Sequence, residues 1–268
     1  MRSMDFFDKH PVFTHGEFVS AHTATGRSPN TSNTLLRKHV AAGRILRVRR
    51  GLYAVVPRGT DPQSAPVDPY LVATALADDA VVAYHAALQF HGKVYSVSRR
   101  FHYFTCARAR PYFFRGADFV PVRVPASLRD LPDFGGGVRE HPHAGGTARV
   151  TTLERALVDV LDAPDKGAGW EEVWRSLEQV EFFDLDAVID YVEKLGLAIT
   201  AARVGFFLEQ HRDALMVEDS HLDELGQLGP GEPRYFDPGR QSGKLVSRWN
   251  LVVPEQILSR SWEEVLYW

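Results

Sequence analysis

The chain has 268 residues, of which 44% are hydrophobic and 24% are charged, with one cysteine and a formal net charge of −3. This apolar content is enough for a sizeable core, and the length favours two or three domains. The single Cys106 excludes an internal disulfide framework and a zinc ribbon, which need several cysteines. No signal peptide is visible and no apolar run approaches the ~20 residues of a membrane helix, so a cytoplasmic protein is expected.

The first predicted elements are two helices and a hairpin. A capping box at residues 14–17, flanked by two phenylalanines that can form a hydrophobic staple, predicts a helix that begins at His15. Ser28 and the proline after it supply an N-cap and a first-turn residue for a second helix, which runs to residue 42. Residues 45–55 then read as a β-hairpin with a tight Arg-Arg-Gly turn.

A linker with four prolines leads to a middle region and then to a helical one. The middle region is predicted to contain one helix over residues 68–90 and strands at residues 101–106, 119–124 and 148–151. A second capping box, at residues 151–154, predicts the first of several amphipathic helices. These helices are expected near residues 153–162, 170–180, 186–195 and 201–211, before a terminal β-like element at residues 244–253.

Charge is distributed unevenly over these regions. Residues 1–59 carry ten Lys and Arg against three Asp and Glu, residues 60–148 carry nine against eight, and residues 149–268 carry twelve against twenty-three. The basic residues 1–59 suit a polyanion such as nucleic acid as partner. The alternative is that they pair with the acidic residues 149–268 inside the protein. The predicted fold class is α+β: a winged helix-turn-helix at residues 1–59, an α+β middle region at 60–150 and a mainly helical, acidic region at 151–268.

Helix, turn, helix and basic hairpin is the order of a winged helix-turn-helix, whose second helix enters the major groove of DNA. One arc of that helix is expected to pack against the first helices, with Ser32, Leu35, Leu36, His39 and Val40. The opposite arc carries Asn, Thr, Arg and Lys, the residue types that reach base edges and phosphates. DNA contacts are therefore predicted for Asn30, Thr31, Thr34, Arg37 and Lys38, and for Arg47, Arg49 and Arg50 in the hairpin. The alternative is that this polar face is an ordinary solvated helix surface. The basic hairpin beside it favours DNA binding.

Three segments resemble the AbiEi-type antitoxins of type IV toxin-antitoxin systems: LLRKHVAAGRILRVRRGLYAVVP, VDPYLVATALADDAVVAYHAALQFHG and TTLERALVDVLDAPDKGAGWEEVWRSLE. The resemblance implies an N-terminal winged helix that binds operator DNA and represses its operon, with residues 30–38 and 47–50 in contact with the DNA. It also implies antitoxin activity against a nucleotidyltransferase-like toxin for a region that would include residues 151–211. No residue motif for toxin contact can be transferred.

The leading hypothesis is accordingly a sequence-specific repressor of its own promoter that acts as a type IV antitoxin and needs no cofactor. Inverted repeats in the promoter would match a homodimer, although the sequence does not fix the oligomeric state. A second hypothesis makes the C-terminal region a protein-interaction module that neutralises a toxin, with DNA binding auxiliary. Four aromatic residues are candidates for its docking face, although such clusters more often form core: Trp170, Trp174, Phe182 and Phe183.

The sequence shows no residue motif that would support catalysis, so no catalytic residue and no metal site are predicted. An endonuclease, the third hypothesis, needs an acidic residue near an acid-x-Lys motif, and no Glu-x-Lys, Asp-x-Lys or Gln-x-Lys occurs. Residues 239–245 resemble a P-loop but are one residue short and lack its Ser or Thr, which predicts a turn. His85 and His91 lie six residues apart, which does not place two ligands on one helix face. His141 and His143 stand beside glycines in what reads as a loop.

Overall fold

The computed structural model describes residues 3–237, 239–260 and 262. The chain forms two compact units. Unit 1 consists of Met1–Val82, Arg99–Val122 and Arg139–Val150, and unit 2 of Ala83–Ser98, Arg123–Val138 and Thr151–Trp268. The middle region of the sequence therefore contributes to both units, and the division into three domains stays a prediction. Among the described residues, no helix has the length and apolar character needed to cross a membrane.

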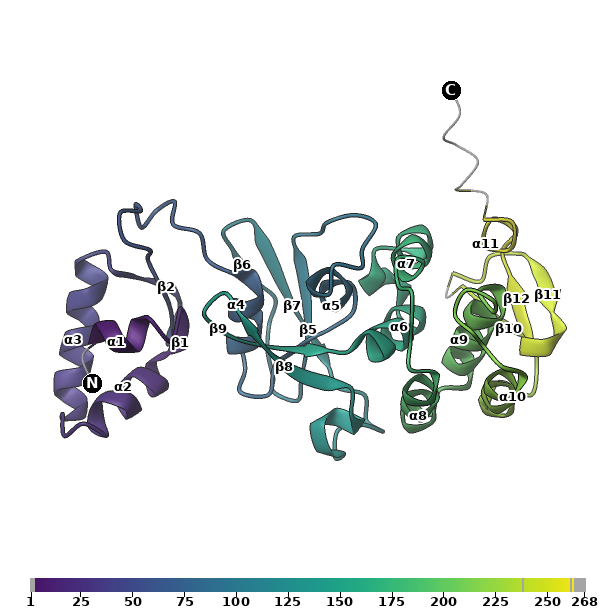
Figure 1. The fold of residues 1–268 in the computed structure, drawn as a ribbon, viewed down its shortest axis with the longest axis horizontal. Helices are drawn as coiled ribbons and strands as arrows, with labels where there is room; N and C mark the ends of the chain where they lie inside the picture. Colours follow the sequence, from purple (N-terminus) through teal and green to yellow (C-terminus); the bar gives the residue numbers. More distant parts are fainter. Residues whose placement is uncertain (1–2, 238, 261, 263–268) are drawn as a thin grey trace, which may run out of the picture. The chain divides into compact units, whose positions relative to one another are not determined.

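Unit 1 begins with three helices and a small antiparallel sheet (Figure 1). The helices are α1 (Ser3–Phe7), α2 (His15–Thr23) and α3 (Pro29–Ala41), and the strands are β1 (Val12–Thr14), β2 (Ile45–Arg49) and β3 (Leu52–Val55), in the order β1-β3-β2. The predicted helix, helix and hairpin are all present, so these residues form a winged helix-turn-helix. Neither α1 nor β1 was predicted, because three to five residues are too few to show a periodic pattern.

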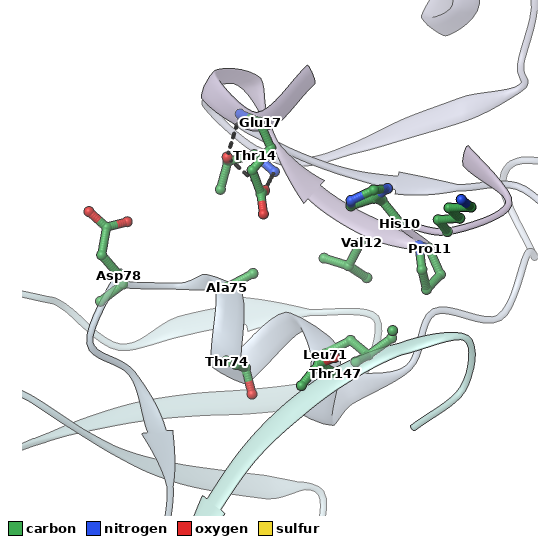
Figure 2. Close-up of a pocket in the computed structure, with 13 residues that line it drawn as sticks. His10, Pro11, Val12, Thr14, Glu17, Leu71, Thr74, Ala75, Asp78 and Thr147 are labelled. Atoms are coloured by element: carbon green, nitrogen blue, oxygen red, sulfur yellow. Dashed lines mark hydrogen bonds between the residues drawn. The ribbon is translucent and has the colours of Figure 1, made fainter. Parts of the chain in front are cut away.

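The capping box and staple at the start of α2 are confirmed. Thr14 Oγ1 accepts a hydrogen bond from the backbone N–H of Glu17 at 3.2 Å, and Glu17 Oε2 accepts one from the backbone N–H of Thr14 at 2.6 Å (Figure 2). The rings of Phe13 and Phe18 stack with their centroids 5.8 Å apart. Both rings belong to a core that fixes α2 and α3 on the sheet, made of Phe6, Phe7, Phe13, Phe18, Leu36 and Ile45.

Helix α3 begins at the predicted cap. Ser28 Oγ accepts a hydrogen bond from the backbone N–H of Thr31 at 3.2 Å, which satisfies one of the free donors of the first turn. Removing that acceptor in Ser28→Ala is expected to lower the free energy of unfolding by about 1 kcal/mol. Chemical denaturation would measure the change against Ser20→Ala, which alters an exposed serine of α2 and should stay within about 0.5 kcal/mol of wild type. Equal effects of the two variants would contradict the capping role.

The rest of unit 1 is a six-stranded mixed sheet with helix α4 (Pro69–Ala75). Its order is β6-β7-β5-β4-β9-β8, with β4 (Val81–Val82), β5 (Arg100–Thr105), β6 (Tyr112–Phe114), β7 (Ala117–Arg123), β8 (Val138–His143) and β9 (Gly146–Thr151). Strand β4 pairs antiparallel with β5 and parallel with β9. The three predicted strands are confirmed as β5, β7 and β9, whereas His141 and His143 lie in strand β8 rather than in a loop.

The single helix predicted over residues 68–90 is wrong. Strand β4 interrupts it and separates α4 from α5 (His85–Phe90). The segment from Ala80 to Ala83 is at most 1% exposed. A strand buried on both faces shows no alternation of polar and apolar residues, and a short apolar run of this kind cannot be told from a helix by its pattern.

Unit 2 is mainly helical. Besides α5 it contains α6 (Leu153–Asp162), α7 (Trp170–Leu177), α8 (Leu185–Leu195), α9 (Ala198–Gln210), α10 (Asp219–Leu228) and α11 (Glu255–Leu258). Helices α6, α8 and α9 pack together, and α10 packs on α8 and α9 (Figure 1). The four predicted helices are confirmed, and α10 was missed. The cap of α6 is Thr152 rather than Thr151, which is the last residue of β9.

A small sheet follows these helices. Its order is β10-β12-β11, with β10 (Arg234–Tyr235), β11 (Lys244–Val246) and β12 (Leu251–Val253). The predicted β-like element at residues 244–253 is therefore two antiparallel strands joined by a 3-10 turn at Ser247–Trp249. Residues 239–243 form the turn and loop that lead into β11, as predicted. Together the two units have the predicted α+β architecture.

Candidate nucleic-acid interface

Helix α3 turns one face to the core of unit 1 and the other to solvent. Ser32, Leu36 and His39 are buried as predicted, whereas Leu35 is half-buried and Val40 is 38% exposed, so the buried arc is narrower than expected. All five polar residues predicted to contact DNA are exposed: Asn30, Thr31, Thr34, Arg37 and Lys38. The sequence pattern therefore assigned the outward face of this helix correctly.

The outward face of α3 is not occupied by internal contacts. Within the described residues, no hydrogen bond or ion pair engages the side chains of Asn30, Arg37 or Lys38. The two threonine hydroxyls have local partners, since Thr34 donates to the carbonyl of Asn30 at 3.0 Å and Thr31 Oγ1 lies 2.9 Å from Ser28 Oγ. The first turn of α3 has no acidic residue, although carboxylates are favoured at the positive end of a helix. This end of the helix is suited to a phosphate.

The hairpin of β2 and β3 presents two of its three predicted arginines to solvent. Arg47 and Arg50 are exposed, and Arg47 Nε donates to the carbonyl of Arg49 at 3.3 Å. The guanidinium of Arg49 is half-buried and donates a hydrogen bond to the carbonyl of Leu76, which follows α4. The side chain of Arg49 therefore links the hairpin to the segment that follows α4, and its contact with DNA stays a prediction.

Two hollows flank α3. The first, of about 480 Å³, lies between the helix and the hairpin, and the second, also about 480 Å³, lies beside the N-terminal half of the helix. The first is lined by His15, Asn33, Leu36, Arg37, Arg47, Arg50, Gly51 and Tyr53. The second is lined by Arg27, Asn30, Thr31, Thr34, Leu35 and Lys38. Among the described residues no carboxylate lines either hollow, and the lining groups are neutral or cationic.

Sequence reasoning missed two residues of the first hollow. His15 Nε2 and Asn33 Oδ1 lie 2.6 Å apart and join the first residue of α2 to α3. The backbone N–H of His15 also donates to the carbonyl of Gly51 at 2.8 Å. These bonds hold the start of α2, the helix and the hairpin turn together at the floor of the hollow. Eighteen residues separate the two side chains, so no local pattern could have paired them.

Another hollow in unit 1 has a different character. It has a volume of about 440 Å³ and lies between the start of α2 and the surface made by α4 and β9 (Figure 2). Its lining includes Lys9 and His10 but also two carboxylates, those of Glu17 and Asp78. Mixed charge of this kind does not match a polyanion. In this respect it differs from the two hollows beside α3, whose lining is neutral and cationic.

The aromatic cluster proposed as a docking face lies mostly inside unit 2. Trp174 is fully buried, with its ring 5.2 Å from that of Phe207, and Phe183 is 1% exposed. Trp170 is half-buried and Phe182 is 61% exposed. The four residues therefore do not form one exposed surface. Trp174 of α7 packs on Phe207 of α9, and Phe182 and Phe183 lie in the segment before α8.

Comparison with known proteins agrees with this geometry. Residues 1–56 match the model of a family described as the AbiEi antitoxin transcriptional regulators. The N-terminal region, residues 1–56, is similar to the AbiEi antitoxin transcriptional regulators. Residues 1–56 span α1, α2, α3 and the whole hairpin. They include every residue that lines the two hollows beside α3. The resemblance seen in the sequence is thereby confirmed for the winged helix.

The whole chain also has a structural relative. It is similar to the crystal structure of the RV2827C protein from Mycobacterium tuberculosis, with a TM-score of 0.55 and 17% sequence identity over 98% of this chain and 94% of that one. At this identity the likeness establishes that the AbiEi region and the rest of the chain share a fold with that protein, and it carries no activity. No curated protein matches the sequence.

Proposed function

We propose that the protein is a sequence-specific DNA-binding repressor of its own promoter and acts as the antitoxin of a type IV toxin-antitoxin system. The observation that carries the DNA-binding role is the pair of hollows on either side of α3. Their lining includes arginine, lysine, asparagine and threonine, and no carboxylate of the described residues. The family match over residues 1–56 supports a transcriptional regulator.

The proposed docking follows from the dimensions of DNA. The major groove is about 12 Å wide and admits an α-helix, so α3 would lie in it with its N-terminal half toward the bases. Asn30 and Arg37 then act as base readers, because asparagine matches adenine and arginine matches guanine with two hydrogen bonds. Arg47 and Arg50 bind the phosphates beside the groove. Phosphate contacts set the register of the protein on the duplex, and base contacts give the sequence preference.

Single substitutions separate these two roles. Arg37→Ala is expected to cost ~1 to 3 kcal/mol of binding free energy on the protein's own upstream DNA and to relax the sequence preference. Arg50→Ala is expected to weaken binding to every duplex alike and to reduce the salt dependence. Fluorescence anisotropy on the upstream duplex and on a scrambled one, each across a salt series, would measure both, with Arg58→Ala in the linker as control. Equal losses on the two duplexes for Arg37→Ala would sink its base-reading role.

The antitoxin role is proposed for the acidic C-terminal region. Residues 149–268 carry twelve basic against twenty-three acidic residues, a balance that DNA repels and that leaves this region for a protein partner. A nucleotidyltransferase-like toxin encoded beside this protein is the proposed partner in function. Growth arrest by that toxin should be relieved by the whole chain and by a variant with the DNA-binding arginines removed. Loss of relief in the arginine variant would contradict the division of roles.

A further inference from the structure

The loop between β5 and β6 carries two exposed arginines that the winged helix does not account for. Arg108 and Arg110 are exposed, and neither makes a hydrogen bond or ion pair with the part of the chain that the structure describes. The strands that this loop joins belong to unit 1, as does the winged helix. Residues 99–122 contain five arginines and a single acidic residue, Asp118, so this segment carries a net positive charge.

Both ends of the loop are tied to neighbouring elements. At its start, the carboxylate of Asp79 accepts hydrogen bonds from the hydroxyl of Thr105 and from the backbone N–H of Cys106, the latter at 2.6 Å. At its end, the hydroxyl of Tyr112 donates to the carbonyl of Val48 in strand β2 of the hairpin. The loop is therefore fixed beside the hairpin.

The hairpin is held from its own side as well. Arg49, which follows Val48, donates to the carbonyl of Leu76, three residues before Asp79. Because a chain extends by at most about 3.6 Å per residue, the Cα atom of Arg110 lies within about 7 Å of that of Tyr112. Through Tyr112, Arg110 is thus held near β2. The exposed Arg50 directly follows that strand and begins the turn. Along each strand of a duplex, phosphates follow one another at about 3.4 Å of helix axis. A DNA backbone that passes the hairpin therefore also passes Arg110.

We propose that Arg108 and Arg110 bind the DNA backbone beside the site read by α3, so that the DNA-contacting surface extends from the winged helix onto the middle sheet. This inference rests on the proposed function. The two arginines add affinity without sequence preference, because guanidinium groups on phosphates read no base. The ties through Val48 and Asp79 keep them in position before DNA arrives.

The double variant Arg108→Ala/Arg110→Ala tests this directly. On the upstream duplex and on a scrambled duplex alike, the slope of log Kd against log salt is expected to fall by about 2, because each lost phosphate contact lowers it by ~0.9. The ratio of the two affinities should stay as in wild type. Arg234→Ala/Lys244→Ala removes the same charge from exposed positions of unit 2 and should leave the slope unchanged.

The outcomes separate the inference from the proposed function. An unchanged slope in the loop variant, with wild type bound to DNA, overturns the inference and leaves the repressor standing. Equal slope changes in the loop and control variants also overturn it, since they would reflect net charge alone. Absence of DNA binding by the wild type overturns the proposed function and this inference with it.

The only cysteine of the sequence offers a second test. Cys106 is exposed and begins the loop, so an iron–EDTA reagent can be attached to it. With binding of the labelled protein verified by anisotropy, strand cuts are expected next to the bases that the protein protects. Cys106→Ser treated with the same reagent should give no cuts. A labelled protein that binds DNA without cutting it would contradict the placement of the loop.

Discussion

The triple variant Arg37→Ala/Arg47→Ala/Arg50→Ala is expected to lose specific DNA binding while it remains folded. The three guanidinium groups line one hollow between α3 and the hairpin, and their side chains are exposed. One base contact worth ~1 to 3 kcal/mol and two phosphate contacts together predict a loss of about 10³-fold on the upstream duplex at physiological salt. The aromatic core beneath is untouched, so the thermal midpoint should stay within a few degrees of wild type.

A lysine version of the same variant separates charge from recognition. Lysine keeps the positive charge but loses the planar fork that matches guanine and phosphate with paired hydrogen bonds. Arg37→Lys/Arg47→Lys/Arg50→Lys should therefore keep salt-dependent binding to a scrambled duplex and lose most of its preference for the upstream one. If the alanine variant bound the upstream duplex as tightly as wild type, this hollow would not be the DNA-binding surface.

The sequence predicted the winged helix well because its signals are local. The capping box at residues 14–17, the cap at Ser28 and the turn at residues 49–51 each depend on side chains within four residues of one another. Strand β4 escaped prediction for the opposite reason. Its residues are buried on both faces by elements distant in sequence, and only the folded sheet shows why an apolar run there is a strand.

The residues predicted to contact DNA are all exposed on the helix, but only two of the three in the hairpin are exposed. Arg49 and Arg50 are identical neighbours, but Arg49 is the last residue of β2, after a register irregularity, whereas Arg50 lies in the turn. One therefore reaches Leu76 while the other faces solvent. The two arginines of the β5–β6 loop lie about 60 residues beyond the hairpin in sequence, and the bond from Tyr112 to Val48 brings that loop beside it. Such contacts require the tertiary structure.

The other large effect is expected from Arg155 in unit 2. This arginine of α6 is 1% exposed, and its Nη1 donates to the carbonyls of Phe134 at 3.1 Å and Gly136 at 2.7 Å. Asp133 and Phe134 have φ values of 45° and 50°, a conformation that is costly for residues other than glycine. Arg155 thus holds a strained loop against the helix.

Arg155 also compensates a buried carboxylate. Its Nε lies 3.6 Å from Asp159 Oδ2, and Asp159 Oδ1 accepts a hydrogen bond from the hydroxyl of Tyr191 at 2.8 Å. Burial raises the pKa of Asp159 to about 6, against the opposing effects of Arg155 and of that hydrogen bond. Because Arg155→Ala would leave this group buried without its cation, the free energy of unfolding is expected to fall by about 3 to 5 kcal/mol near neutral pH.

The pH dependence of that loss distinguishes the ion pair from the loop contacts. A carboxyl whose pKa is higher in the folded than in the unfolded state lets the folded state keep its proton, so stability falls as pH rises through the interval between the two values. Without Arg155 the pKa of Asp159 rises beyond about 6 and the interval extends upward. Urea titrations should therefore show a larger deficit for Arg155→Ala at pH 8 than at pH 5. Adding Asp159→Asn should remove the difference between the two pH values and leave the part that comes from the carbonyls of the strained loop. A deficit that is the same at both pH values in Arg155→Ala would mean that the loop contacts, and not the charge of Asp159, are what the arginine sustains.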